Sequence, residues 1–251
     1  MLKKLKSALR IPALTLRPLI LKSLVFSGLL ILVNWKGGVF WFLVFIVASF
    51  YFYFRAPFKW KDFFFSFLIL FSYSLAITDY LKSGSLIILA SAVFGALFFL
   101  LLGVKNFAFI HRQNIFNVLS GFLYFIVSVA FFIVDKSKSL SFLFYYLITF
   151  FAFYFILKES FDFLPANFPK SRKSLIVIGT TFLIAELLIG VALLPIGFLN
   201  SAALMLLFIF ILEDFISYYL KGGLNRRIIL NNITILMAAI IFIFAASKWT
   251  P

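Results

Sequence analysis

The chain has 251 residues, 65% of them hydrophobic and only 12% charged, and its mean hydropathy is +1.15. A soluble core of this size cannot hide 39 phenylalanine side chains, so the composition excludes a water-soluble protein and predicts one embedded in lipid. The net charge of +15 comes from bases that fall in short clusters between long apolar runs, which argues against nucleic-acid binding and is typical of loops beside an anionic membrane surface.

Residues 1–18 are expected to form a basic amphipathic segment on the cytoplasmic surface of the membrane. Three leucines at helical spacing share this segment with five bases: Leu2, Leu5, Leu9, Lys3, Lys4, Lys6, Arg10 and Arg17. A cleaved signal peptide is the less favoured alternative, because the charged region is long and no small-x-small cleavage site follows the apolar run.

Residues 19–251 are predicted to form a single transmembrane domain, an all-α polytopic bundle. Nine apolar runs follow one another along the chain: 19–34, 38–54, 63–80, 85–103, 115–134, 140–157, 174–196, 201–220 and 228–247. Most of them are long enough to cross a hydrocarbon core of about 30 Å at about 1.5 Å per helical residue. The first run is the weakest, because Lys22 must reach the interface for that helix to span. We therefore expect about nine transmembrane helices.

The distribution of bases predicts an N-terminus inside the cell and a C-terminus outside. In this orientation 18 of the 23 lysine and arginine residues lie on the cytoplasmic side, as the positive-inside rule requires. Tryptophans near the predicted helix ends fit interfacial anchors: Trp35, Trp41, Trp60 and Trp249. The expected location is the plasma (cytoplasmic) membrane.

Three acidic residues lie within the predicted helices, where a charged side chain costs about 2.5–3.5 kcal/mol on insertion scales. The first, Glu186, is expected near the membrane midplane. It shares one helical face with Gly179, Gly190 and Gly197, and small residues let a neighbouring helix approach closely. We interpret Glu186 as a proton or cation site, as a protonated group that only binds another helix, or as a contact for a lipid headgroup or substrate.

The other two acids, Glu213 and Asp214, are adjacent and lie roughly 10–12 Å inside the cytoplasmic end of their helix. Adjacent helical residues point about 100° apart, so the two cannot share one partner. Asp214 lies on a polar stripe with Ser217, Tyr218 and Lys221 and can be satisfied partly within its own helix, whereas Glu213 needs a partner from another helix. For Asp214 we weight a structural role and a functional role equally. For Glu213 we slightly favour a functional role.

Polar residues near the cytoplasmic ends of the helices predict a vestibule that faces the cytoplasm. A polar stripe on a membrane helix is expected to face a cavity or another helix, because lipid offers it no hydrogen bonds. The candidate vestibule residues are His111, Arg112, Asn117, Tyr124, Arg226, Arg227, Asn231 and Asn232. The alternative is that each stripe is an ordinary contact between helices, with His111 in a loop beside lipid headgroups.

The sequence predicts no cofactor and no metal site. It has no cysteine and only one histidine, which excludes disulfides, iron–sulfur clusters and multi-histidine metal or haem sites. It also lacks the G-x-x-x-x-G-K-[ST] motif of P-loop nucleotide binding. The polar segments HRQNIFN (111–117) and ESFD (159–162) lack the paired acids that hold Mg²⁺ on a diphosphate.

Three functions are compatible with these features. The preferred one is a secondary transporter or permease for a small solute or ion, with Glu186 as the intramembrane proton or cation site. The second is a membrane-embedded enzyme acting on a lipid or polyprenyl-linked substrate, with a cytoplasmic-side site made from Glu213, Asp214, His111 and the arginines and no catalytic residue assigned among them. The third is a non-catalytic membrane subunit or assembly factor. Expected partners are the bilayer with its anionic headgroups, a small-molecule or lipid substrate, and a membrane protein or second copy of the chain.

Overall fold

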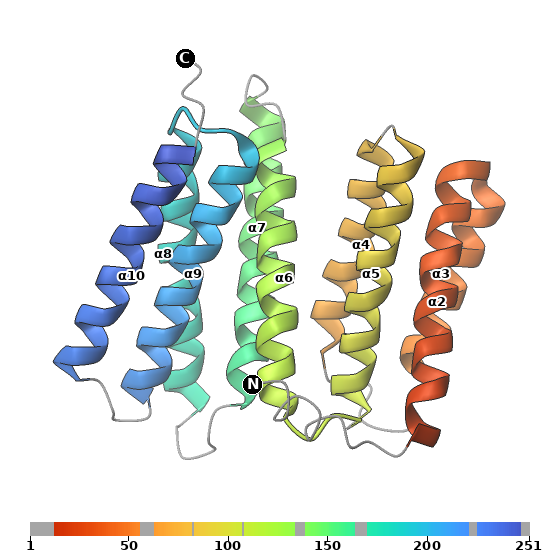
Figure 1. Ribbon diagram of the computed structural model, residues 1–251, viewed down its shortest axis with the longest axis horizontal. Helices are drawn as coiled ribbons and strands as arrows, with labels where there is room; N and C mark the ends of the chain where they lie inside the picture. Colours follow the sequence, from red (N-terminus) through yellow and green to blue (C-terminus); the bar gives the residue numbers. More distant parts are fainter. Residues whose placement is uncertain are drawn as a thin grey trace. The chain divides into compact units, whose positions relative to one another are not determined.

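Figure 1 shows the computed structural model, which describes residues 13–55, 63–81, 83–106, 108–133, 139–163, 170–220 and 225–246. These residues form nine α-helices and one short 3-10 helix, and they contain no strand. The elements are α2 (Ala13–Lys36), α3 (Val39–Phe54), α4 (Phe64–Tyr80), α5 (Gly84–Lys105), α6 (Arg112–Ile133), α7 (Ser139–Ser160), η1 (Phe161–Phe163), α8 (Lys170–Ala192), α9 (Phe198–Leu220) and α10 (Arg226–Ala246). The predicted all-α fold is thus confirmed for this part of the chain.

Six of these helices are long and apolar enough to cross a membrane: α2, α5, α6, α7, α8 and α9. Helices α3 and α4 and the segment Ile229–Ile241 of α10 are apolar but shorter. Large apolar side chains lie on the outside of the helices, with Val39 of α3 74% exposed and Leu175 of α8 73% exposed. Such a surface is stable against hydrocarbon and not against water. The chain is therefore an all-helical integral membrane protein.

Several sequence predictions concern residues outside the described ranges. Residues 1–12 of the predicted surface segment lie outside them, and the remainder of that segment belongs to α2, which begins at Ala13. The same holds for part of the predicted anchors and loop bases: Lys59, Trp60, Lys61, Lys82, Lys136, Lys138, Lys221, Lys248 and Trp249.

Two glycines form the turn between α2 and α3. Gly37 has a φ of 61° and Gly38 a φ of 87°, a left-handed conformation that residues with a Cβ seldom adopt. The backbone N–H of Gly37 donates a hydrogen bond to the Val33 carbonyl and so closes the last turn of α2. The chain then reverses and begins α3 within two residues.

The chain divides into two compact units, Met1–Leu123 and Tyr124–Pro251, and the boundary falls within α6. In the first unit α2 packs against α3 and α5, and α4 packs against α5. At the α2–α5 contact, a Cβ on Gly95 would lie 2.9 Å from Ser27 Cβ. Ser27 Oγ also donates a 2.8 Å hydrogen bond to the Ser91 carbonyl. Small residues spaced four apart on both helices permit this approach, as is common between membrane helices.

Aromatic rings fill the core of the first unit. Phe26 of α2 stacks on Phe98 of α5 with ring centroids 4.4 Å apart, and its ring lies 5.0 Å from that of Phe45 in α3. Tyr53 of α3 stacks on Phe67 of α4 at 4.3 Å. Each such pair contributes about 0.5–1.5 kcal/mol beyond its buried area. Ring packing matters here because lipid gives apolar helices little reason to associate.

Lys105, the last residue of α5, is buried in this unit and only 1% exposed. Its Nζ donates a 2.7 Å hydrogen bond to the carbonyl of Tyr53 and lies 3.4 Å from the centroid of that ring. The last carbonyls of a helix lack partners within the helix and carry partial negative charge, so the ammonium group stabilises the end of α3. Lys105 lies two residues beyond the predicted apolar run 85–103, so hydropathy alone places it outside the helix.

In the second unit α7 packs against α8, α8 against α9, and α9 against α10. Figure 1 shows these helices running alternately up and down, so that α8 and α10 begin at the end of the unit where α9 finishes. The second half of α6 packs on α7 through two ring contacts, Tyr124 with Phe153 at 6.0 Å and Phe131 with Phe142 at 5.5 Å.

Candidate functional site

A group of polar side chains lies where α6, α7 and α9 meet in the second unit. We call it the Glu213 cluster, and it consists of Tyr124, Glu159, Ser160 and Glu213. The Tyr124 hydroxyl donates a 2.7 Å hydrogen bond to Glu213 Oε1, and the Ser160 side chain makes a second hydrogen bond to the same carboxyl group. Tyr124 is fully buried and Glu159 is 6% exposed. One carboxyl group therefore links three helices inside an apolar bundle.

The partners of Glu213 in the described part of the chain are hydroxyl groups rather than lysine or arginine. A hydroxyl group can donate to a carboxylate and can accept a hydrogen bond from a protonated carboxyl group. The same two partners can therefore serve Glu213 in both of its protonation states. A permanent ion pair would instead hold the carboxylate in its charged form.

Asp214, the next residue of α9, has a different hydrogen-bond partner from Glu213. Asn232 Nδ2 of α10 donates a 2.7 Å hydrogen bond to Asp214 Oδ2, and Asn232 is only 8% exposed. The separation of Glu213 and Asp214 follows from the 100° rotation per helical residue. The sequence had predicted that Asp214 is satisfied partly within its own helix, whereas the observed side-chain partner comes from the following helix.

Glu159 is a member of the Glu213 cluster that the sequence analysis did not propose as a site residue. The predicted apolar run ended at residue 157, which left Glu159 in a loop, but α7 continues through Ser160. The Glu159 carboxyl group lies within electrostatic range of the Tyr124 hydroxyl. The sequence did contain a signal: Glu159 lies only two residues after the predicted run, and apolar residues such as Phe161 and Phe163 follow it.

Glu186 has a different environment from Glu213. Its side chain is exposed on α8, and it has neither a hydrogen bond nor an ion pair with any other described residue. The hydroxyl of Tyr146 in α7 lies within electrostatic range of it. A Cβ on Gly179 or Gly190, which share its face, would meet nothing within 4 Å. The face that was predicted to receive a neighbouring helix is therefore uncovered by the described chain.

The predicted vestibule residues are divided between the two units. Within the first unit His111 and Asn117 are exposed, while Arg112 Nε donates a 2.8 Å hydrogen bond to the Val104 carbonyl. Within the second unit, Tyr124 and Asn232 are buried. Tyr124 donates its hydrogen bond to Glu213, and Asn232 donates to Asp214. The remaining three are exposed at the start of α10: Arg226, Arg227 and Asn231.

A pocket of about 270 Å³ lies beside η1, near the end of α7 and the beginning of α8. Its walls include Tyr154, Lys158 and an ion pair in which Lys173 Nζ lies 2.9 Å from Asp162 Oδ1. Asp162 is 66% exposed in its side chain, so this pair contributes little to stability. Among the described residues, no group of three or more acidic, histidine or cysteine side chains is arranged to hold a metal ion.

No protein-family model, curated protein or solved structure matches the chain.

Proposed function

We propose that this protein is a secondary transporter or permease for a small solute or ion, and that Glu213 is its intramembrane proton or cation site. The observation that supports this is the 2.7 Å hydrogen bond between Tyr124 and Glu213, in a carboxyl environment made of neutral hydroxyl groups. Acids inside membrane helices are costly and often form proton relays or ion paths. A carboxyl group with partners for both protonation states is suited to take up and release a proton.

Two further polar residues near Tyr124 support a path for the proton to and from Glu213. Glu159 lies toward the end of α7, close to the Tyr124 hydroxyl. Ser128 lies one turn beyond Tyr124 on α6, and its buried Oγ has no hydrogen bond to the described residues. Buried unpaired hydroxyl groups commonly bind water, and water can carry a proton onward. Two acids and two hydroxyl groups thus lie near one another in a single unit, with bound water as the proposed link to Ser128.

The geometry favours Glu213 over Glu186, which was the preferred site at the sequence level. A transport site has to be shielded from lipid, because neither a proton nor a solute is exchanged with hydrocarbon. Glu213 is half-buried and hydrogen-bonded to residues of two other helices, Tyr124 of α6 and Ser160 of α7, whereas Glu186 is exposed on α8. Glu186 therefore serves as the matched control for Glu213, since both are glutamates within membrane helices.

The experiment uses the purified full-length chain in liposomes. An imposed membrane potential should drive proton uptake, read by a pH-sensitive dye, and Glu213→Gln should abolish it while Glu186→Gln retains it. Infrared spectroscopy gives a readout that needs no solute: a carboxyl C=O band should titrate with pH in the wild type and in Glu186→Gln, and be lost in Glu213→Gln. An unchanged band and unchanged uptake in Glu213→Gln would contradict the proposal.

We also propose that all nine helices cross the plasma membrane, with the N-terminus inside. The two shortest full helices, α3 with 16 residues and α4 with 17, extend about 24–26 Å at 1.5 Å per residue. A bilayer can thin locally by this difference from about 30 Å. The chain has no native cysteine, so single cysteines at Ser7 and Thr250 can be labelled without background. They should react from opposite sides of the membrane, and labelling from one side would exclude an odd number of crossings.

A second function, that of a membrane subunit, is favoured by the environment of Glu186. A lipid-facing acid costs free energy, and glycines on the same face allow close approach of a helix from another protein. A complex isolated in mild detergent should then lose its partner in Glu186→Leu and keep it in Glu213→Gln. Retention of the partner in both variants would exclude docking through this face.

A further inference from the structure

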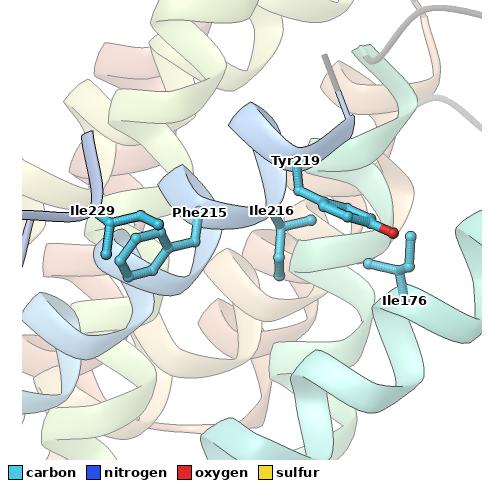
Figure 2. A pocket seen from close by; sticks show the side chains of 5 residues that line it. All are labelled: Ile176, Phe215, Ile216, Tyr219 and Ile229. Carbon is cyan, nitrogen blue, oxygen red and sulfur yellow. The ribbon is translucent and has the colours of Figure 1, made fainter. Parts of the chain in front are cut away.

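An apolar groove of about 360 Å³ crosses the surface of the second unit near the end where α8 begins, α9 finishes and α10 begins. It is lined by one residue of α8, three of α9 and one of α10: Ile176, Phe215, Ile216, Tyr219 and Ile229. Figure 2 shows that the Tyr219 ring extends toward Ile176, with its hydroxyl at the tip. Apart from that hydroxyl, the lining side chains are hydrocarbon. The groove therefore fits a long apolar group that enters from the surrounding lipid.

Two bases lie one helical turn from the groove, toward the membrane surface. Arg172 precedes Ile176 by four residues on α8, and Arg226 precedes Ile229 by three residues on α10, so each base shares a helix face with a lining residue. Both arginines are exposed, and neither forms an ion pair within the described ranges. Lys173, by contrast, is neutralised by Asp162.

We propose that this groove binds an anionic phospholipid, with one acyl chain along Ile176 and Ile229 and the phosphate between Arg172 and Arg226. Charge complementarity selects this occupant, because an apolar groove beside two arginines matches a molecule with a hydrocarbon chain and a negative head. Basic pockets between membrane helices commonly hold such headgroups. Tyr219 lies where an amphipathic ring is stable, with its body in the groove and its hydroxyl toward the polar layer. This site is separate from the Glu213 cluster and does not depend on transport.

Native mass spectrometry of the full-length chain can test this site with equimolar phosphatidylglycerol and phosphatidylcholine of identical acyl chains. The first bound lipid should be phosphatidylglycerol in preference to phosphatidylcholine. Each base near a membrane surface strengthens anionic lipid binding about fivefold, so Arg172→Gln with Arg226→Gln should reduce the preference by about that factor per charge. The matched control is Arg17→Gln with Arg227→Gln, which removes the same charge from exposed positions off the groove. An unchanged preference in the first pair, or an equal loss in both pairs, would overturn the proposal.

Separate variants test whether an acyl chain occupies the groove. Ile176→Trp fills the groove and should weaken the first lipid adduct, whereas Leu175→Trp, on a side chain that is 73% exposed, should leave it unchanged. In the wild type, short-chain phosphatidylglycerol should bind more weakly than the long-chain lipid, a comparison that needs no variant. Displacement of the lipid by inorganic phosphate would show a site for a free anion instead. Equal binding of short and long chains would contradict an acyl chain in the groove.

Discussion

The hydroxyl of Tyr124 and the carboxyl group of Glu213 are 89 positions apart in the chain, and their oxygen atoms lie 2.7 Å apart. This single hydrogen bond connects α6 to α9 across two intervening helices. A carboxyl group within the membrane that loses such a partner keeps an unsatisfied hydrogen-bonding atom, which costs free energy. The bond therefore contributes to folding as well as to the proposed transport site.

Tyr124→Phe should lower the free energy of unfolding by about 1–2 kcal/mol, because it leaves Glu213 with one partner fewer and changes the ring little. Denaturant unfolding in detergent measures the loss. Tyr145→Phe is the control, since Tyr145 is 43% exposed on α7, and it should be neutral. A double-mutant cycle with Glu213→Leu should give a non-zero coupling energy, and strict additivity would contradict a direct bond.

Asn232→Leu should destabilise the chain by about 1–3 kcal/mol, because Asp214 loses the amide that donates to it at 2.7 Å. Asn231→Leu changes the neighbouring exposed residue in the same way and should be neutral. The melting temperatures of the two variants, measured by thermal unfolding, are then compared. Equal melting temperatures of the two variants would show that the α9–α10 bond adds no stability.

Lys105→Met should cost about 1.5–3 kcal/mol, because the end of α3 loses a charged donor to the Tyr53 carbonyl while the buried stem keeps its shape. Lys36→Met is the matched control, since Lys36 is also the last residue of a helix but is exposed. Chemical unfolding should separate the two variants clearly. A Lys105→Met protein as stable as Lys36→Met would show that this hydrogen bond does not contribute to the free energy of unfolding.

Gly95→Ala should destabilise the first unit by about 1–3 kcal/mol, because the new methyl group would lie 2.9 Å from Ser27 Cβ and 3.2 Å from the Ser23 carbonyl oxygen. Gly28→Ala places its methyl group in open space in α2 and should be neutral, or stabilising by up to about 1 kcal/mol. Unfolding in detergent tests both. A Gly95→Ala protein as stable as Gly28→Ala would show that α2 and α5 can separate without loss.

The positions of the helices could be predicted from local sequence, and their ends less well. Each predicted apolar run overlaps one observed helix, but α5 continues to Lys105 and α7 to Ser160. Both extensions carry charged side chains that hydropathy assigns to loops. Their burial depends on partners from other helices, the Tyr53 carbonyl for Lys105 and the surroundings of Tyr124 for Glu159. The length of an apolar segment in the sequence contains no information about partners on other helices.

The sequence identified the acidic and polar residues of the candidate site, but not which of them contact one another. Helical geometry correctly separated Glu213 from Asp214, because the rotation of 100° per residue is local. It could not identify Asn232 as the partner of Asp214, nor could it show that Glu186 is exposed. In a soluble protein an apolar stripe reveals the buried face of a helix. A helix in lipid is apolar on every face, so this signal is lost.

The sequence by itself determined that this protein is helical and embedded in a membrane, because a long apolar run in lipid must satisfy its backbone hydrogen bonds internally and a helix does so within one segment. Only the tertiary structure decided which acid has hydrogen-bond partners on other helices and which is exposed. Glu213 and Glu186 are both glutamates within apolar helices, and they differ in the partners that neighbouring helices bring to them. That difference arises from packing between segments distant in sequence, where side-chain contacts rather than hydropathy set the arrangement.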